Sequence, residues 1–561
     1  MKKKNVLLMM LPFWDPLVPP QGIAHLKNYL RHYGYSVKTM DANIEERFKE
    51  IYSKYFSKLQ QYIPQERRGN FFNIGHDVMR NHMLAHVFQK DEDGYCRLVE
   101  DIVYQTYFTR LSNGRVAALN EVLRQFYELL EGYVGEALSV YKPDVFGLSV
   151  PRDSVGPSVF AFHLAKRMDP SLLTVMGGSI FSDHLLPGTP NFDYFLERAP
   201  FIDHVVIGEG QILLKRLLEG EFDASRRVLG KQDLAGERIG FSPLNQPDLT
   251  DFDVPEDYPY QSAQGSASCP FQCSFCNVAA FFGEYRQKEA AQTVDEMEAL
   301  FKQNGLQLFF MNDSMMNHIA DDLARELIDR KLSLYWDGYL RVGPEVCDSD
   351  TTYFWRKGGF YRARMGVESG SQHVLDMMGK GITPEMSLDA LAGLAGQGIK
   401  TTAYMVIGHP GETEEDFQQT LQFMADAKDN IFEAECNPFI FGYSGQSATD
   451  TWARRRKLLF GEEARDTLVL QSWTYDGEPS REEVYRRVCR FVDHCDQLGI
   501  PNTYSLYDIH RADNRWQKLH ANAVPPVLDF KDTRSVINEN LGIKKVCLLE
   551  NTIEDHGDFG F

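Results

Sequence analysis

Short apolar runs alternate with segments of helical periodicity along most of this chain. The first run, Val6–Met10, is continuously apolar, which is typical of a strand that is covered on both faces. Residues Gly22–Leu30 follow with apolar side chains at the spacing of a helix. Further strand-like runs in the N-terminal part are Tyr35–Met40, Val145–Val150, Leu172–Met176 and His204–Ile207. Strands that alternate with helices predict a parallel, doubly wound sheet.

The alternation restarts at about position 261 and gives six further strand signals. The expected strands are Gln261–Ser268, Leu306–Asn312, Leu332–Asp337, Tyr361–Gly366, Ile399–Ile407 and Phe432–Phe439. The helices expected between them include Asp295–Gln303, Ala320–Arg330, Met386–Ala395 and Glu414–Ala427. These β/α units predict a second α/β domain. In barrels built from such units, the reacting groups lie at the C-terminal ends of the strands.

About a hundred residues interrupt the first alternation, which is too long for a plain connection. Residues Ile44–Ile63 carry apolar side chains at steps of three and four, so we expect an amphipathic helix there. A second helical stretch is expected over Val116–Tyr141. The insertion either caps a substrate cavity or is a packed helical decoration. Beyond about Gly445 we expect a mixed helical region, with a break at Pro525-Pro526.

Composition limits the class of protein. Acidic side chains outnumber basic ones by 79 to 59, for a net charge of −20, so a broad nucleic-acid-binding surface is not expected.

The basic start before Val6 looks like a signal peptide, but its apolar run is short and ends at Pro12 without a clear cleavage site, so we expect a buried strand. No apolar run approaches the length of a transmembrane helix. Nine cysteines with one cluster favour a reducing, cytoplasmic location, with Cys489 and Cys495 as packing residues of a helix.

Three cysteines share one short segment with C-x3-C-x2-C spacing: Cys269, Cys273 and Cys276. Three thiolates can hold three corners of a [4Fe–4S] cluster and leave one iron open for another ligand. A structural zinc site requires four nitrogen or sulfur ligands, and positions 277–317 contain neither His nor Cys. Zinc with His318 or a distant cysteine as the fourth ligand is the alternative.

This spacing, with the aromatic Phe275 before the third cysteine, resembles the signature of the radical S-adenosylmethionine (radical SAM) superfamily. The resemblance implies that the open iron binds the amino and carboxylate groups of S-adenosylmethionine. It also implies that an electron from the cluster cleaves this molecule to methionine and a 5′-deoxyadenosyl radical, which takes a hydrogen atom from the substrate. The six β/α units match the partial (β/α)6 barrel of the superfamily. An external electron donor such as flavodoxin or ferredoxin is the implied partner.

Two strand-end motifs support this resemblance. Asp313 follows the second expected strand, where its carboxylate either accepts a hydrogen bond from the methionine ammonium or caps a helix. The G-V-E-S-G-S run at Gly366–Ser371, with Lys380-Gly381 after it, closely resembles a pattern of radical SAM proteins that carry a cobalamin-binding domain. The resemblance implies that Glu368 and Ser369 bind the ribose hydroxyls of S-adenosylmethionine.

Two further positions follow expected strands. Gly408–Thr413 resembles the G-x-P-G-E-T turn of the family, which implies that Gly408 lies beside the adenine. Thr413 is then expected to cap the next helix, and His409 is expected to be structural rather than catalytic. Arg341 lies near the end of the third strand, where it either meets the methionine carboxylate or forms a surface salt bridge.

The start Pro19-Pro20-Gln21-Gly22 resembles that of cobalamin-binding domains fused to radical SAM barrels. The implied cobalamin residues are Gln21, Gly147, Ser149, Gly177, Gly178, Glu209 and Gly210. A doubly wound sheet binds ligands beyond the carboxyl ends of its strands, although glycines there also arise from tight turns. The D-x-H-x-x-G motif that places a histidine below cobalt is absent, because the first loop reads L-P-F-W-D-P. Many fused relatives bind cobalamin without that histidine, and others have lost the cofactor.

The expected fold is α/β, with three parts. Residues 1–225 form a doubly wound, Rossmann-like cobalamin (B12)-binding domain with a helical insertion at about 43–140. Residues 255–445 form the radical SAM barrel, and 446–561 form a mainly helical C-terminal domain. The implied function is a cobalamin-dependent C-methyltransferase acting on an unactivated carbon of a small molecule or peptide. A non-methylating radical SAM enzyme (rearrangement, ring contraction or cyclisation), with or without cobalamin, and a non-catalytic sensor are the alternatives.

Overall fold

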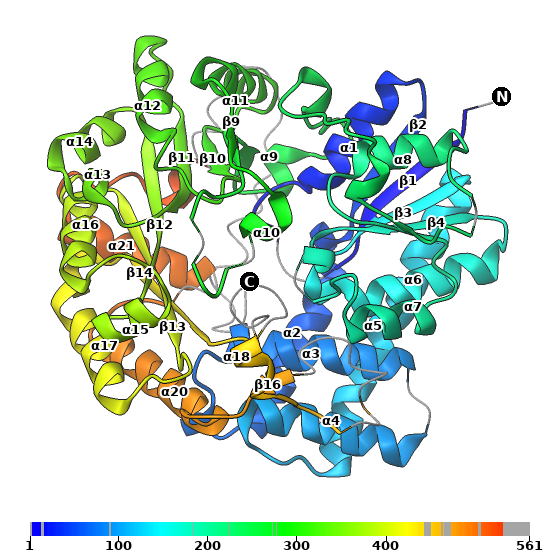
Figure 1. Cartoon of the computed structure of the whole chain (residues 1–561), viewed down its shortest axis with the longest axis horizontal. Helices are drawn as coiled ribbons and strands as arrows, with labels where there is room; N and C mark the ends of the chain where they lie inside the picture. The colour runs from blue at the N-terminus through cyan, green and yellow to red at the C-terminus, as the bar shows by residue number, and fades with distance from the viewer. Residues whose placement is uncertain are drawn as a thin grey trace. The chain divides into compact units, whose positions relative to one another are not determined.

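The computed structural model describes residues 3–12, 16–88, 91–182, 184–223, 225–271, 273–276, 278–441, 450–461, 464, 473–502 and 506–530. The chain forms two compact units. The first comprises Met1–Asp253 and Phe441–Asp476, and the second comprises Val254–Ile440 and Gly477–Phe561. Each unit contains a parallel six-stranded sheet (Figure 1).

The sheet of the first unit has the order β2-β1-β3-β4-β5-β6. Its strands are β1 (Asn5–Met10), β2 (Ser36–Asp41), β3 (Val145–Ser149), β4 (Leu173–Gly177), β5 (His204–Val206) and β6 (Val228–Leu229). Val6 of β1 pairs with Val37 on one side and Val145 on the other, so the chain order reverses at β1. This confirms the doubly wound sheet, and it also confirms that the apolar start of the chain is a buried strand.

Four helices cover the two faces of this sheet between its strands. They are α1 (Gln21–His32), α6 (Val155–Met168), α7 (Pro190–Arg198) and α8 (Gly210–Leu218). The apolar faces of α1 and α8 pack on one face of the sheet through Ile23, Leu30 and Leu213. Helices on both faces explain why the strands are apolar on both faces.

The insertion between β2 and β3 is helical. It contains α2 (Glu46–Tyr62), α3 (Phe71–Phe88), α4 (Glu92–Tyr107) and α5 (Asn113–Tyr141), of which α2 and α5 match the two predicted stretches. Phe126 of α5 packs against Phe48 and Tyr52 of α2. The buried guanidinium of Arg80 on α3 donates to Asp153 at 2.9 Å, which joins the insertion to the loop after β3.

The sheet of the second unit has the order β14-β13-β12-β11-β10-β7. Its strands are β7 (Gln261–Ala263), β10 (Leu308–Met311), β11 (Tyr335–Leu340), β12 (Phe360–Glu368), β13 (Lys400–Ile407) and β14 (Glu433–Pro438). All six predicted strands are present. The first is shorter than predicted, because Ser266–Ala267 (β8) leaves the sheet and pairs antiparallel with Arg286–Gln287 (β9).

Helices cover the outer face of this partial barrel (Figure 1). They include α11 (Ala290–Asn304), α12 (Ala320–Asp329), α14 (Ser349–Lys357), α16 (Pro384–Gly396) and α17 (Glu414–Ala427). Two short helices, α10 (Val278–Phe282) and α15 (Gln372–Met377), follow β8 and β12. On this face Trp336 stacks on Phe360 with ring centroids 4.0 Å apart. The other face of the strands carries buried charge, including Arg364, which donates twice to Asp337 at 2.6 and 2.8 Å.

Two C-terminal helices, α20 (Arg481–Gln497) and α21 (Leu506–Leu519), belong to the second unit. Asp513 of α21 forms a buried ion pair with Lys400 of β13 at 2.5 Å. Cys495 of α20 packs in the barrel core, as predicted for a packing residue. The predicted helical C-terminal region is therefore attached to the barrel. Of the helices that the structure describes, none is long and apolar enough to cross a membrane.

Candidate active site

The three predicted cluster cysteines lie on one loop between β8 and α10. Each is a free thiol, with Cys269 and Cys273 partly buried and Cys276 exposed. Within the described ranges, no three His, Cys, Asp or Glu side chains form a ready metal site, and the alternative ligand His318 contacts the ring of Tyr285 instead. A cluster therefore requires the loop to bring its sulfurs together. Three free thiols on one loop suit an iron–sulfur cluster.

Two contacts anchor the cysteine loop. The N–H of Ser274 donates to the carbonyl of Met378 at 3.0 Å. Nη1 of Arg341 donates to the sulfur of Cys273 at 3.3 Å, and its guanidinium lies 4.2 Å from the ring centroid of Phe271. Arg341 therefore lies against the cysteine loop. Its contact with the methionine carboxylate stays a prediction.

Asp313 follows β10 and is almost completely buried. Its Oδ2 accepts a hydrogen bond from the N–H of Gly265 at 3.1 Å, while its Oδ1 is buried without a hydrogen-bond partner among the described residues. Burial raises the pKa of Asp313 to about 6, against the opposing effects of Ser266, Gly265 and Lys288. Asp313 does not cap a helix, because the next helix, α12, begins at Ala320. The buried Oδ1 suits the predicted contact with the nitrogen of the methionine part, which stays a prediction.

Glu368 ends β12 with a φ of +68°, which is uncommon for a residue other than glycine. Its Oε1 accepts a hydrogen bond from Nζ of Lys380 at 2.6 Å, and both side chains are buried. Nζ of Lys380 also lies 5.7 Å from the ring centroid of Phe275 on the cysteine loop. Ser268, just before Cys269, has a φ of +73°. Strained backbone of this kind is concentrated at functional sites, and here it occurs at both the cysteine loop and the G-V-E-S-G-S turn.

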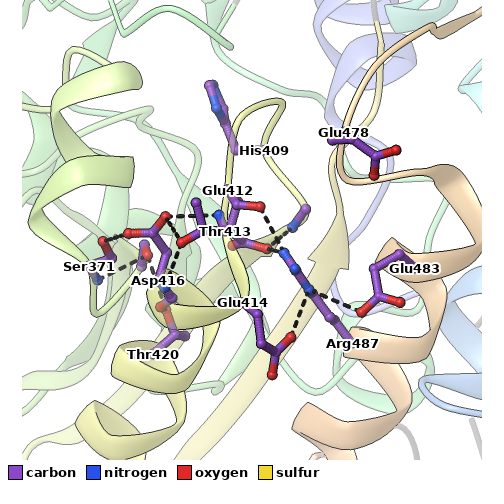
Figure 2. Close-up of polar contacts among 12 residues, drawn as sticks. Ser371, His409, Glu412, Thr413, Glu414, Asp416, Thr420, Glu478, Glu483 and Arg487 are labelled. Atoms are coloured by element: carbon purple, nitrogen blue, oxygen red, sulfur yellow. Dashed lines mark hydrogen bonds and ion pairs between the residues drawn. The ribbon is translucent and has the colours of Figure 1, made fainter.

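Both serine hydroxyls of the G-V-E-S-G-S turn form hydrogen bonds with α17. Oγ of Ser369 lies 3.1 Å from Oγ1 of Thr420, which also accepts the N–H of Gly370 at 3.1 Å. Oγ of Ser371 donates to Asp416 at 2.6 Å (Figure 2). These bonds fix the turn against the helix that follows the next strand. The roles of Glu368 and Ser369 at the ribose stay predictions.

The turn after β13 depends on two glycines, Gly408 and Gly411, with φ values of +80° and +95°. Thr413 caps α17 in a reciprocal pair with Asp416, so its predicted role as a cap is confirmed. The ring of His409 packs edge-on against Phe439 at 5.1 Å, and burial lowers the pKa of this imidazole to about 4. A neutral, packed imidazole agrees with the structural role predicted for His409.

Glu412 in the same turn carries an interaction that the sequence did not indicate. Its Oε2 accepts a hydrogen bond from the N–H of Gly408 at 3.0 Å and one from Nη1 of Arg487 on α20 at 2.8 Å (Figure 2). Burial raises the pKa of Glu412 to about 7, although Arg487 opposes that shift. The turn is thus tied to a helix that lies far along the sequence.

The predicted cobalamin residues of the first unit lie along one side of its sheet. Ser149 and Gly177 end β3 and β4, Gln21 begins α1, Glu209 is the N-cap of α8, and Gly210 is its first residue. Neither α1 nor α8 has a side-chain cap, so backbone N–H groups at both helix starts remain for a ligand. The start of α1 follows β1, where the chain order reverses, which is the usual ligand position of such sheets, and the start of α8 follows β5. This edge therefore suits a corrin with its nucleotide tail.

Two of the predicted glycines have packing reasons of their own. A Cβ on Gly147 would lie 2.7 Å from Cδ2 of Leu8 on the neighbouring strand. A Cβ on Gly178 would lie 2.3 Å from the backbone nitrogen of Val150, and Gly178 has a φ of +117°. Both glycines are required by the sheet itself, so their direct contact with cobalamin stays a prediction. Part of the first loop, residues 13–15, lies outside the described ranges.

Comparison with protein families identifies the central part of the chain. The family model of the Radical SAM superfamily matches residues 265–424, which run from the segment before the cysteines into α17. A curated relative, the anaerobic magnesium-protoporphyrin IX monomethyl ester cyclase of Rubrivivax gelatinosus, is 28% identical over 53% of this chain and 57% of its own length. An uncharacterized methyltransferase of Pyrococcus horikoshii is 25% identical over 52% of this chain and 66% of its own length. The chain thus spans less than two thirds of these curated relatives.

Solved structures extend the likeness in fold to almost the whole chain. The radical S-adenosylmethionine methyltransferase TsrM of Kitasatospora setae, with cobalamin and a [4Fe–4S] cluster bound, matches with a TM-score of 0.60 and 15% identity, over 96% of this chain and 100% of its own. The cobalamin-dependent S-adenosylmethionine radical enzyme OxsB matches with a TM-score of 0.51 and 14% identity, over 97% of this chain and 62% of its own. At these identities the likeness establishes the fold.

Proposed function

We propose that this chain, a radical SAM protein by the match of its residues 265–424, is a cobalamin-dependent C-methyltransferase. One observation carries the proposal: a three-cysteine loop on a partial barrel and a doubly wound sheet occur in one chain. The same combination of folds occurs in TsrM, a methyltransferase whose structure holds both cobalamin and a [4Fe–4S] cluster.

The two cofactors account for the presence of both units. When bound, the cluster supplies the electron that cleaves S-adenosylmethionine to methionine and a 5′-deoxyadenosyl radical, and methylcobalamin supplies the methyl group for a substrate carbon radical. The protein holds these groups and excludes water. Cys269, Cys273 and Cys276 hold three irons and leave the fourth open.

The strand ends of the barrel hold S-adenosylmethionine. The buried Oδ1 of Asp313 accepts a hydrogen bond from an N–H of its amino group. Arg341, whose Nη1 donates to the sulfur of Cys273, would pair with its carboxylate. Glu368, held by Lys380, and Ser369 face the ribose, and Gly408 allows the backbone to approach the adenine.

The carboxyl edge of the first sheet holds cobalamin. Backbone N–H groups at the starts of α1 and α8 suit the phosphate of its nucleotide tail, since helix N-termini bind anions. Gln21, Ser149 and Glu209 supply polar side chains at the same edge, and Gly177 and Gly210 keep it clear of side chains. The enzyme is cytoplasmic, receives electrons from a donor such as flavodoxin or ferredoxin, and acts on a small molecule or a peptide.

Transfer of a labelled methyl group tests this function. The protein is produced with cobalamin supplied, its cluster is reconstituted anaerobically, and it is reduced in the presence of S-adenosylmethionine with a deuterated methyl group. We expect co-purified corrin and, by mass spectrometry, methylcobalamin with the full label. A protein that stays free of corrin under these conditions would remove cobalamin from the mechanism.

A non-methylating radical SAM enzyme is the second candidate, and the similarity to an anaerobic cyclase favours it. Both candidates share the barrel chemistry and differ in the fate of the methyl group. Once a substrate is identified, a product that is modified but carries no label would establish the second candidate. A product that is heavier by one labelled methyl group would establish the first.

A further inference from the structure

Helix α20 lies outside the residues that match the superfamily, yet it contacts the turn that follows β13. Nη1 of Arg487 donates to the carbonyl oxygen of Glu412 at 3.0 Å and to its Oε2 at 2.8 Å (Figure 2). The side chains of Arg487 and Glu412 are only 5% and 1% exposed. Nε of Arg487 also lies 3.4 and 3.5 Å from the more exposed carboxylates of Glu483 and Glu414. Loss of Arg487 would therefore leave the carboxylate of Glu412 buried without its counter-charge.

The same carboxylate closes the turn. Oε2 of Glu412, which accepts from Arg487, also accepts the N–H of Gly408 at 3.0 Å. Gly408 is the first residue of the turn and has a φ of +80°. The position of Arg487 therefore influences the backbone at the residue where we expect the adenine.

Two further contacts join the segment around α20 to this turn. The N–H of Gly411 donates to the carbonyl of Glu478 at 2.9 Å. Val484 packs so closely on Gly408 that a Cβ there would lie 2.3 Å from Cγ2 of Val484. The turn is thus held by a backbone bond, an apolar contact and a buried ion pair, all from residues 478–487.

A second ion pair, between Arg490 of α20 and Glu414 of α17, is more exposed to solvent. Arg490 donates to both carboxylate oxygens of Glu414 at 3.1 and 2.6 Å, but the two side chains are 43% and 50% exposed. Exposed pairs contribute little to stability. Glu414 is the first residue of α17 and lies outside the turn. Glu414 also lies 3.5 Å from Nε of Arg487, so Arg490→Met is a control that removes a neighbouring charge and leaves the Arg487–Glu412 pair in place.

We infer that Arg487 is a positioning residue of the S-adenosylmethionine site, which it serves by fixing Glu412 and the Gly408–Thr413 turn. This inference rests on the proposed function, because the turn needs fixing for binding only if it receives the adenine. It makes the C-terminal helix a part of the cofactor site. Arg487 acts through Glu412 and touches neither the reacting atoms nor the ligand.

The test compares Arg487→Met, Arg487→Lys and the control Arg490→Met in the reconstituted full-length protein. The dissociation constant for S-adenosylmethionine is measured by anaerobic equilibrium dialysis, and the rate of 5′-deoxyadenosine formation is measured at saturating ligand. We expect Arg487→Met to weaken binding about tenfold or more, with a smaller effect on the saturated rate. Arg487→Lys restores part of the affinity, because it keeps the charge beside Glu412. Arg490→Met binds within about twofold of the wild type.

A second variant keeps the test decisive if Arg487→Met does not fold. Glu412→Gln retains the shape of the side chain and an acceptor for Gly408 but removes the charge that Arg487 pairs with. We expect it to weaken binding, and we expect Glu412→Gln combined with Arg487→Lys to be no weaker than the poorer single variant. Folded variants with four irons and wild-type affinity would overturn the inference. A wild-type protein that neither binds nor cleaves S-adenosylmethionine would instead overturn the proposed function.

Discussion

The buried carboxyl group of Asp313 gives a quantitative prediction for the pH dependence of S-adenosylmethionine binding. Its pKa of about 6 in the ligand-free protein means that it is ionised at pH 8 and mainly protonated at pH 5. The amino group of S-adenosylmethionine donates a hydrogen bond to the ionised carboxylate, so affinity should rise with pH through 6. At pH 5 only about one carboxyl in eleven is ionised, so binding should be weaker than at pH 8 by about tenfold, or roughly 1.4 kcal/mol.

Asp313→Asn should remove this dependence. The amide keeps the size of the side chain but cannot ionise, so the step near pH 6 disappears. At pH 8 the variant loses a hydrogen bond to a charged group, which contributes about 1.5–3 kcal/mol, so binding should weaken by at least about tenfold. Asp322→Asn, at an exposed position on α12, is the control and should keep the wild-type profile.

Equilibrium dialysis of labelled S-adenosylmethionine between pH 5 and 8, with iron content checked at each pH, measures the effect. The stability of the ligand-free protein should change in the opposite direction. Because the folded state keeps the proton of Asp313 up to about pH 6, ionisation costs stability as the pH rises from about 4 to 6, by about 3 kcal/mol in total. A wild-type binding profile that is flat through pH 6, or one that Asp313→Asn leaves unchanged, would refute this role of the carboxylate.

Three further predictions concern the cluster, the barrel and the first sheet. Replacement of Cys273 by Ala should abolish the cluster absorbance and S-adenosylmethionine cleavage together, since each thiolate holds a separate iron; a variant with four irons and normal turnover would contradict this. Asp513→Ala should lower the free energy of unfolding by about 3–5 kcal/mol, measured in denaturant, because it leaves Lys400 buried without its counter-charge; a loss below about 1 kcal/mol would show that Lys400 finds another partner. Gly178→Ala should destabilise the first unit and weaken cobalamin binding in a spectroscopic titration, because its Cβ would clash with the backbone of Val150; unchanged stability and binding would mean that the loop relaxes at little cost.

Most of the sheet architecture could be predicted from the sequence, because parallel strands covered on both faces are nearly continuous apolar runs. Strand β1 is one example. The expected first barrel strand was too long, because the segment after Ala263 is rich in Ser, Gly and Ala and has no periodicity that separates a strand from a turn. Helix α3 was not predicted, since it buries Arg80, Asn81 and His82, which hide its apolar face.

The candidate site was predictable where its residues follow strands. Asp313, Glu368 and Gly408 were all found from motifs at strand ends. Arg487 was missed because Glu412, its partner, lies 75 positions earlier in the sequence. In the sequence, Arg487 looks like one half of an ordinary surface pair with Glu483, four residues earlier on the same helix. Lys380 was visible in the Lys-Gly pair of the G-V-E-S-G-S pattern, but only the structure shows that it bonds to Glu368.

The central claim is that the cysteine loop and the strand ends of the barrel cleave S-adenosylmethionine reductively. The most direct measurement is anaerobic reduction of the reconstituted protein with dithionite in the presence of S-adenosylmethionine, followed by chromatographic quantification of 5′-deoxyadenosine and methionine. The account predicts both products from the wild-type protein and neither from Cys276→Ala. A wild-type protein that holds an intact, reduced four-iron cluster and yet forms no 5′-deoxyadenosine would contradict it.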